Sequence, residues 1–490
     1  MGIVLFGLTV RGRAGNFDSV ESALALKNHA GPLEAHHEQS PYAEFLRLKN
    51  NGTILLDRSH AALAAPDVGF IPDENKYYSF YLSGITHLIV PLYWVGYALG
   101  LAQVFAYFTI SLIAIATMIL IYITGIRVWK FSNNEALLAA ITFGFATFAW
   151  SYSITIYQHM PTTLLAVVMF LSAYEYKKSK RSRWLVLTGG AYGISSFFDY
   201  PNLIILSPYV VYAFINTISL HSKSGKHYLS VRPAAAWMAL TILTIGAIHG
   251  ARNAYYFGNP TMYANLLPRY SLDPELTAAW MKIKFITPIF QESYIPYGMV
   301  LYFLLPEKAF WIFSPILLMS FLGIYLVRKH MDAKHKLHIA LCVFTALFYM
   351  SFFDAAGGFA FGPRYLIPIL PSMCYFAVMA ISSSFSHLKL RKGFYYVLFA
   401  ISSFIATLGA VTTNMIPTSL DAQYYNKPFS TYALNWQVML HGESSTFIYH
   451  ELVRPYMSMA TYILMLWLAV LVSITFILYP NFYKKLKLNR

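Results

Sequence analysis

The sequence predicts an all-α polytopic membrane protein, and three observations support this fold class. Of the 490 residues, 57% are hydrophobic and only 12% are charged, about half the charged fraction of an ordinary soluble domain. Apolar runs of about 20 residues recur along the chain, and each is long enough to cross a hydrocarbon core of about 30 Å. Short basic loops separate these runs, as is typical of cytoplasmic loops. We therefore interpret the net charge of +15 as a topology signal and not as a surface for nucleic acid.

The apolar runs predict a bundle of about twelve transmembrane helices in a single integral membrane domain, residues 1–490. The boundaries follow the polar breaks between the runs. The first run is short for a span, which leaves open whether Met1 is the true start. The expected spans lie at 1–11, 101–126, 136–152, 157–174, 184–199, 201–220, 233–249, 309–328, 337–353, 365–386, 393–414 and 456–479.

The segments between the spans differ in charge, and this difference predicts the orientation of the chain. With about twelve crossings and both termini in the cytoplasm, every strongly basic segment falls on the cytoplasmic side. The opposite side receives three long segments, 12–100, 250–308 and 415–455, so we expect a multi-pass cell-membrane protein with an extracytoplasmic active site. The basic segments are EYKKSKRSR (175–183), HSKSGKHYLSVR (221–232), VRKHMDAKHK (327–336), HLKLRK (387–392) and YKKLKLNR (483–490).

Residues 82–100 are apolar but are not counted as a span. Counting them would invert every later loop and move the basic segments to the outside. Tyr93, Trp94 and Tyr97 belong to this stretch, and such aromatic side chains favour the headgroup region. We therefore expect a re-entrant or interfacial helix at the end of the first extracytoplasmic segment.

Asp18 and Glu21 follow the first apolar run at a spacing of three residues. Ionisable groups at the ends of membrane helices are costly, so they indicate a functional site by default. A structural alternative stays open, because Asp18 fits the N-cap of a following helix and Glu21 completes a capping-box-like pattern. A cap does not exclude catalysis, since the same carboxylate stands at the expected outer surface.

Other ionisable residues are expected at the same outer surface, from several parts of the sequence. Arg364 lies in GGFAFGPRYLIPILP, where glycines and prolines bend the chain, and its planar guanidinium suits phosphate oxygens. For the remaining residues an ordinary role is open as well, as a helix-end histidine, a turn residue or an interfacial anchor. These residues are His159, Asp199, Arg252 and Asp354.

The stretch DENKYYSFYLSG (73–84) combines charged and aromatic side chains within the first extracytoplasmic segment. Tyr77 and Tyr78 are candidates for binding sugar, because aromatic faces stack on sugar rings and hydroxyls bond to sugar hydroxyls. An ordinary interfacial aromatic belt is the structural alternative.

These motifs resemble the GT-C glycosyltransferases, polyprenyl-phosphate-sugar-dependent membrane enzymes that include protein O-mannosyltransferases and lipid A aminoarabinose transferases. FGPRYLIPILP (361–371) is similar to a recurring GPRYLLPVLP, and DENKYYSFYLSG to DGKYYSFYPPG. LLPEKAFWIFSPILL (304–318) resembles a third element, LFSPRRGLFFYSP. Two features of this sequence differ from the family. The two acidic residues are usually adjacent in the family, whereas Asp18 and Glu21 are three residues apart, and the family's Pro-Pro-Gly is replaced here by Leu82-Ser83-Gly84.

The resemblance implies a GT-C-like bundle whose extracytoplasmic loops carry interfacial helices, and a sugar transfer from a polyprenyl-phosphate donor. Asp18 would be the base of an inverting displacement, with Glu21 in support. Arg364 would bind the donor phosphate, with Arg252 or Lys76 in place of the basic residue that the family often has at the aromatic loop. The acceptor is open between a lipid, a glycan and a protein, and no metal site is assigned, although a divalent cation (Mg²⁺ or Mn²⁺) is open as a cofactor. The expected substrate-binding residues are Tyr77, Tyr78, His159, Asp199 and Asp354.

Two other functions are kept as alternatives. A multi-pass transporter or lipid flippase also fits about twelve spans, but such proteins usually place charges near the bilayer midplane and show internal repeats. An O-antigen ligase or polymerase-like enzyme would act at the same face with a diphosphate-linked donor. The sequence contains no Walker loop, G-x-G-x-x-G or H-E-x-x-H motif, which argues against a nucleotide-driven pump, a dehydrogenase and a zinc protease.

Overall fold

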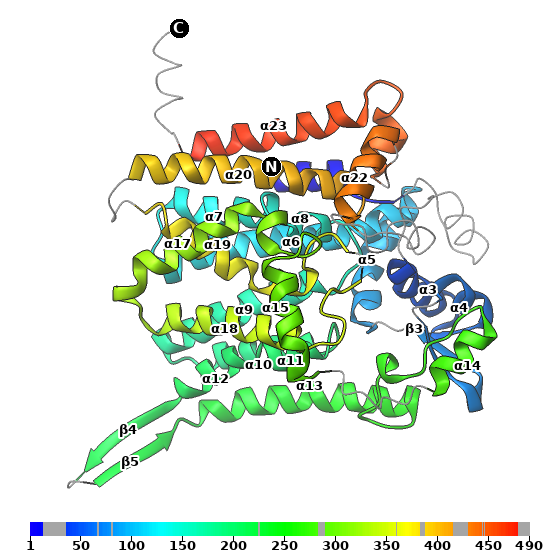
Figure 1. The fold of residues 1–490 in the computed structure, drawn as a ribbon. Coiled ribbons are helices and arrows are strands. Elements are labelled where there is room, and N and C mark those ends of the chain that lie inside the picture. Colours follow the sequence, from blue (N-terminus) through cyan, green and yellow to red (C-terminus); the bar gives the residue numbers. More distant parts are fainter. Residues whose placement is uncertain are drawn as a thin grey trace.

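The structure, a computed structural model, describes residues 1–12, 36–65, 68–79, 82–223, 226–282, 290–358, 360–382, 388–414, 430–442, 444 and 446–478. This part of the chain is mostly helical, with two small antiparallel sheets. Many of the long helices run side by side, roughly parallel or antiparallel to one another (Figure 1). Such an arrangement is typical of helix bundles.

Helices occupy almost all of the expected spans. Four of the spans are divided between elements. Residues 136–152 contain α7 and α8, and residues 201–220 contain α11 and α12. Residues 309–328 contain α16, the 3₁₀ turn η6 and α17, and residues 365–386 contain η8 and α19. The helices are α1 (Gly2–Thr9), α3 (His36–Asn51), α4 (Arg58–Ala64), α5 (Gly84–Ala98), α6 (Ala102–Thr124), α7 (Asn133–Phe145), α8 (Ala149–Tyr152), α9 (His159–Ser179), α10 (Arg183–Ser195), α11 (Pro201–Ile205), α12 (Ser207–Ile215), α13 (Ala234–Phe257), α14 (Pro274–Lys282), α15 (Ile295–Phe303), α16 (Phe310–Phe313), η6 (Pro315–Leu317), α17 (Leu318–Val327), α18 (Ala333–Met350), η8 (Arg364–Ile369), α19 (Leu370–Met379), α20 (Leu388–Val411), α22 (Ser430–His441) and α23 (Met459–Leu478).

Among the described residues, four helices are long and apolar enough to cross a membrane. The helices in the other expected spans do not meet both conditions, so the number of about twelve crossings stays a prediction. Helix α5, which contains Pro91, occupies the stretch that was expected to be re-entrant or interfacial. The four helices are Ala102–Trp129, Ala234–Phe257, Leu388–Val411 and Met459–Leu478.

The candidate site residues and the basic segments lie at opposite ends of the helices that connect them. Helix α9 starts at His159 and runs into the basic segment 175–183, and α10 returns from that segment towards Asp199. Helix α18 likewise leads from the basic segment 327–336 towards Asp354. The bundle therefore has a basic end and a site end, as the predicted topology requires, while the side of the membrane that each end faces stays a prediction.

A three-stranded sheet corrects the prediction that the chain is entirely α-helical. Its strands pair in the antiparallel order β1-β3-β2, with Leu55 opposite Tyr78 and Phe70 opposite Tyr77. The strands have two to four residues, too few for their alternation to stand out beside apolar helices. They are β1 (Leu55–Leu56), β2 (Val68–Ile71) and β3 (Lys76–Ser79).

A second sheet is a hairpin in the segment that was expected to be a basic loop. Strand β4 (Ile218–Lys223) pairs antiparallel with β5 (Lys226–Val231). Because β4 begins at Ile218, the expected span 201–220 is too long, and α12 ends at Ile215. Figure 1 shows the hairpin outside the bundle, beyond the start of α13.

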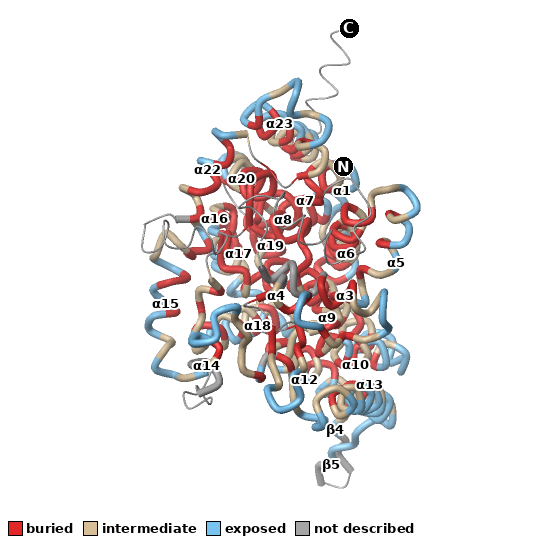
Figure 2. The backbone as a smooth tube through the Cα atoms, turned by 90° about the vertical axis from the view of Figure 1, so that its right-hand side faces the viewer, coloured by how far each residue is buried: buried red, intermediate tan, exposed pale blue. Residues whose placement is uncertain are grey.

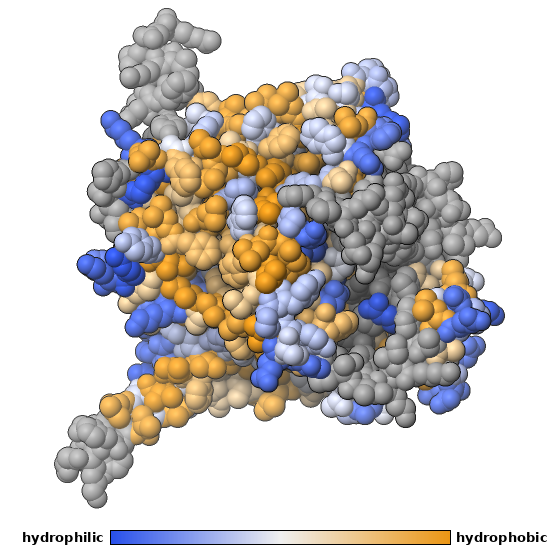
Figure 3. All heavy atoms as spheres, viewed as in Figure 1, coloured by the Kyte–Doolittle hydropathy of each residue, from blue (hydrophilic) through white to orange (hydrophobic). Residues whose placement is uncertain are grey.

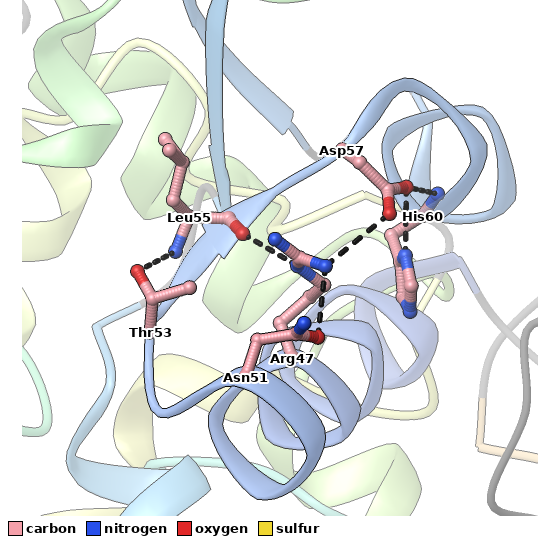
Figure 4. A network of polar contacts seen from close by, with 6 residues as sticks. All are labelled: Arg47, Asn51, Thr53, Leu55, Asp57 and His60. Carbon is pink, nitrogen blue, oxygen red and sulfur yellow. Dashed lines mark hydrogen bonds and ion pairs between the residues drawn. The ribbon is translucent and has the colours of Figure 1, made fainter.

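A network of polar contacts joins α3, β1 and α4 (Figure 4). Arg47 donates from Nε to the carbonyl oxygen of Leu55 (2.9 Å) and from Nη1 to Oδ1 of Asn51 (2.9 Å) and Oδ2 of Asp57 (3.4 Å). Oδ1 of Asp57 caps α4 by accepting from the backbone N–H of His60 at 2.9 Å and lies 2.8 Å from its ring Nδ1. These contacts hold the three elements as one unit.

Buried residues, red in Figure 2, lie in the centre of the bundle, whereas α13 lies at its surface. Of the most apolar stretch of α13, only 11% is buried within the protein, compared with 61% for the corresponding stretch of α20. Leu240, Leu243 and Ile248 are exposed on α13, and an apolar surface follows this helix in Figure 3. An apolar exposed helix of this length is suited to contact with lipid.

Candidate functional site

Arg364 begins the 3₁₀ helix η8 and is only 8% exposed. Its Nη1 donates to the hydroxyl of Tyr157 at 3.0 Å. The guanidinium carbon lies 5.4 Å from the ring centroid of Tyr157 and 5.3 Å from that of Tyr365, within the range of cation–π attraction. Gly362, with φ +73°, turns the backbone just before this helix, in a conformation that favours glycine. The bend predicted from the sequence therefore exists, and it places a buried guanidinium between two aromatic rings.

Lys308 supports the loop that carries Arg364. Its side chain is 3% exposed, and its Nζ donates to the carbonyl oxygens of Ala360 (2.6 Å) and Gly362 (3.4 Å). Burial, and then the charge of Arg364, lower the pKa of Lys308 to about 7. Lys308 lies within LLPEKAFWIFSPILL (304–318), a stretch that resembles a family element, but it was not among the predicted site residues. The available signal was a cation directly before an apolar, proline-interrupted segment.

His159 and Asp199 lie beside Arg364. The His159 ring is 2% exposed and stacks on Tyr157, with centroids 5.8 Å apart and an interplanar angle of 17°. Its Nε2 has no hydrogen-bond partner within the described part of the chain. The carboxylate of Asp199 accepts a hydrogen bond from the side chain of Gln158 and is attracted by Arg364. The structure thus brings together three residues that are distant in the sequence.

Asp354 shapes the glycine turn that precedes Arg364. Its Oδ1 accepts from the backbone N–H of Gly358 at 3.3 Å, and its carbonyl oxygen accepts from Gly357 at 3.0 Å. Its charge also acts on Lys308. Asp354 therefore belongs to the same cluster, and its visible contacts are those of a turn residue.

Arg252 forms a second polar cluster with Glu44, a carboxylate that was not among the predicted site residues. Arg252 lies inside α13, beyond the expected end of that span, and donates from Nη2 to Oγ of Ser83. Glu44 of α3 is 2% exposed, is hydrogen-bonded to Thr86 and is attracted by Arg252. Burial raises the pKa of Glu44 to about 8, and its Oε1 has no hydrogen-bond partner among the residues described. No pattern in the sequence singles out Glu44, because α3 is polar overall.

Two contacts join the second cluster to the turn that carries Asp199. The backbone N–H of Gly84 donates to the carbonyl oxygen of Phe197 at 3.0 Å. Oγ of Ser196 lies 3.0 Å from Nδ1 of His249, one turn before Arg252 on α13. The two clusters therefore meet at the same end of the bundle, on either side of the turn between α10 and α11.

The three predicted site residues of strand β3 make their described contacts with residues outside the Arg364 cluster. Lys76 is paired with Glu74, and its side chain is 40% exposed. Tyr77 is buried against Phe70, with ring centroids 4.8 Å apart and an interplanar angle of 18°. Tyr78 is also buried and donates from its hydroxyl to the carbonyl oxygen of Tyr256 at 2.7 Å, which places it near the end of α13. The roles of all three in substrate binding stay predictions.

Asp18 and Glu21 lie outside the described residues. Their assignment as base and supporting carboxylate stays a prediction. In the parts of the chain that the structure covers, no group of three or more His, Cys, Asp or Glu side chains is arranged to hold a metal ion.

Comparison with known proteins finds similarity in structure only. No protein-family model and no curated protein matches the chain. The chain is similar to ArnT from Cupriavidus metallidurans in the apo state, at 14% identity over 96% of this chain and 74% of that chain, with a TM-score of 0.48. For the same protein bound to undecaprenyl phosphate the identity is 14% over 96% and 75%, with a TM-score of 0.45.

A second similarity is to the oligosaccharyltransferase of Archaeoglobus fulgidus in the apo form, at 10% identity over 84% of this chain and 57% of that chain, with a TM-score of 0.41. Both proteins are GT-C membrane glycosyltransferases, the superfamily that the sequence motifs resemble. At these identities and TM-scores, neither similarity carries a conclusion about the activity of this chain.

Proposed function

We propose that the protein is a membrane glycosyltransferase that moves a sugar from a polyprenyl-phosphate donor to an acceptor hydroxyl. The observation that supports this function best is the buried guanidinium of Arg364, beside His159 and Asp199 at the site end of an apolar bundle. Arg252 supplies a second cation at the same end. A lipid-linked phosphate presents an anion at the membrane surface, and guanidinium groups bind phosphate oxygens well.

In the proposed reaction, the carboxylate of Asp18 takes the proton of the acceptor hydroxyl as its oxygen attacks the anomeric carbon of the sugar. The bond between that carbon and the donor phosphate oxygen breaks, and the phosphate leaves with the electron pair. A single displacement of this kind inverts the anomeric configuration. A well-placed base typically contributes about 10²–10⁴-fold to the rate.

Arg364 would stabilise the charge that develops on the departing phosphate. Preorganised groups of this kind are often the largest catalytic contribution, and the Tyr157 hydroxyl and the loop held by Lys308 fix the guanidinium before substrate binds. His159 and Asp199 would contact the acceptor or the sugar. We infer that the site faces the outside of the cell, because the basic segments lie at the other end of the bundle.

The test uses the full chain in lipid nanodiscs with polyprenyl-phosphate-linked sugars and candidate acceptors. We expect Asp18→Asn to abolish transfer while polyprenyl phosphate still binds, as measured by native mass spectrometry. We expect Arg364→Ala to lose both binding and transfer. Glu275→Gln, a change at an exposed position of α14, is the control and should keep both.

Two results would overturn the proposal. Full transfer activity of Asp18→Asn would remove the assigned base. Movement of the donor across the bilayer without any transfer would instead support the transporter or flippase alternative.

A further inference from the structure

The β4–β5 hairpin leaves the bundle at its basic end and extends away from it (Figure 1). The base of the hairpin is closed by a hydrogen bond, in which the backbone N–H of Arg232 donates to the carbonyl oxygen of Thr217 at 3.0 Å. Nearby, Nζ of Lys180 donates to the carbonyl oxygen of Asn216 at 3.0 Å. The hairpin is therefore an anchored projection.

The register gives the hairpin two different faces. Ile218 pairs with Val231 and Leu220 pairs with Leu229, so these apolar positions share one face. On that face Leu220 is 67% exposed, Leu229 is 74% exposed and Val231 is 52% exposed. Such exposure of neighbouring large apolar side chains is unusual on a surface that meets only water.

The opposite face carries polar and basic positions. Ser219 pairs with Ser230, His221 with Tyr228 and Lys223 with Lys226. Arg232 follows directly, and the sequence from residue 200 to residue 272 contains no aspartate or glutamate. The hairpin is therefore amphipathic, and its charge is entirely positive.

The surroundings of the hairpin indicate what covers its apolar face. It directly precedes α13, one of the helices long and apolar enough to cross a membrane, and the least buried of the four. Trp237 near the start of α13 is 55% exposed, and Ile215 at the end of α12 is 57% exposed. The exposed apolar surface of the hairpin thus continues into that of two helices, at the level where α13 would enter the bilayer.

We propose that the hairpin is a membrane-surface anchor that rests on a leaflet containing anionic lipids. Its apolar face packs at the boundary between headgroups and acyl chains, and its lysines bind the negatively charged headgroups. Amphipathic elements with an apolar face and a basic face bind such surfaces by burying apolar area and by electrostatic attraction to the anionic lipids. The anchor would fix the rotation of α12 and α13 in the bilayer, independently of any transfer activity.

The test compares two positions on opposite faces of one strand. In a Cys342→Ala background, Leu229→Cys and Ser230→Cys are each labelled with an environment-sensitive fluorophore, and Cys374 is fully buried. The protein is reconstituted in nanodiscs of phosphatidylcholine, alone or mixed with phosphatidylglycerol. We expect nitroxide-labelled lipid to quench the label at residue 229 in the anionic nanodiscs, and iodide to quench the label at residue 230.

Charge variants test the role of the lysines. Lys223→Glu combined with Lys226→Glu should lower the ratio of docked to undocked hairpin by at least about fivefold for each lysine, as expected near an anionic surface. Lys178→Glu combined with Lys329→Glu, two exposed lysines elsewhere at the basic end, is the matched control and should change the ratio little. High salt should weaken docking, since it screens surface charge.

Two outcomes would overturn the anchor. In the first, the two labels are equally open to iodide in both kinds of nanodisc. In the second, the label at residue 229 is protected in detergent as protein concentration rises, which would show that a second copy of the chain covers this face.

Discussion

A Cβ atom on Gly357 would lie 2.8 Å from Nε of Arg364, and Gly357 has a φ of +62°. The tight turn before η8 is therefore packed directly against the guanidinium. Gly258 is a matched position, because its φ is +71° and no atom lies within 4 Å of its added Cβ. A comparison of alanine substitutions at the two glycines therefore distinguishes the effect of backbone strain from the effect of displacing Arg364.

We predict that Gly258→Ala loses roughly 1–2 kcal/mol of stability, the cost of an alanine in the left-handed region. Gly357→Ala should lose more, because its Cβ also meets Arg364 and the ring of Tyr365. Only Gly357→Ala should lose sugar transfer and polyprenyl-phosphate binding, because only it displaces Arg364. Thermal unfolding and the transfer assay measure the two effects. If both variants transfer sugar equally well, the packing of Gly357 on Arg364 is not needed for function.

The hydrogen bond from Arg364 to Tyr157 gives a second prediction. Tyr157→Phe removes this bond but keeps the ring, so transfer should fall by about tenfold, the cost of one hydrogen bond to a charged group. Arg364→Lys should lower the transfer rate by about 10²–10³-fold, since an ammonium group cannot reproduce the planar, two-pronged hydrogen bonding of a guanidinium. Steady-state rates with one donor and acceptor give the comparison, and Tyr325→Phe, an exposed tyrosine, is the control.

Lys308 should act on Arg364 through the backbone. Lys308→Met keeps the apolar stem but leaves the carbonyl oxygen of Ala360 without its donor, which typically costs about 1–3 kcal/mol for a buried group. We expect a lower melting temperature and weaker binding of polyprenyl phosphate. Lys329→Met, at an exposed position, should change neither. Unchanged lipid binding by Lys308→Met would show that the loop holds its shape without this lysine.

The sequence was sufficient to predict the helices and much of the cluster around Arg364. Apolar runs mark helices because a membrane requires long stretches without charge. His159, Asp199 and Asp354 could be grouped because each stands at the end of a run opposite a basic segment, and successive antiparallel helices bring alternate ends together. The structure places all three near Arg364 or its loop.

Burial of single charged residues could not be predicted in the same way. Glu44 lies in HHEQSPYAEFLRLKNN, a polar helix by composition, and its burial depends on how α3 packs against the start of α5 and the end of α13. Lys76 was expected at the phosphate, but the short strand β3 places it beside Glu74 instead. Contacts of this kind come from tertiary packing and leave no periodic signal in the sequence.

The last prediction concerns the pH dependence that Glu44 should give to stability. Burial raises its pKa from 4.5 to about 8 in the folded protein, and α3 lies outside the candidate membrane helices. Between these two pH values the folded state holds a proton that the unfolded state releases. The stability due to this group is therefore fully present below about pH 4.5 and is lost as the pH rises through about 8.

Glu44→Gln has no such proton to lose, so its melting temperature should rise relative to that of the wild type between pH 5 and pH 9, by at least about 3 °C. Thermal unfolding in one detergent across this pH range measures the difference. Glu275→Gln changes an exposed carboxylate and serves as the matched control. A constant difference between Glu44→Gln and the wild type across the range would mean that the carboxyl group is solvated or is paired with Arg252 as an ion in the folded protein.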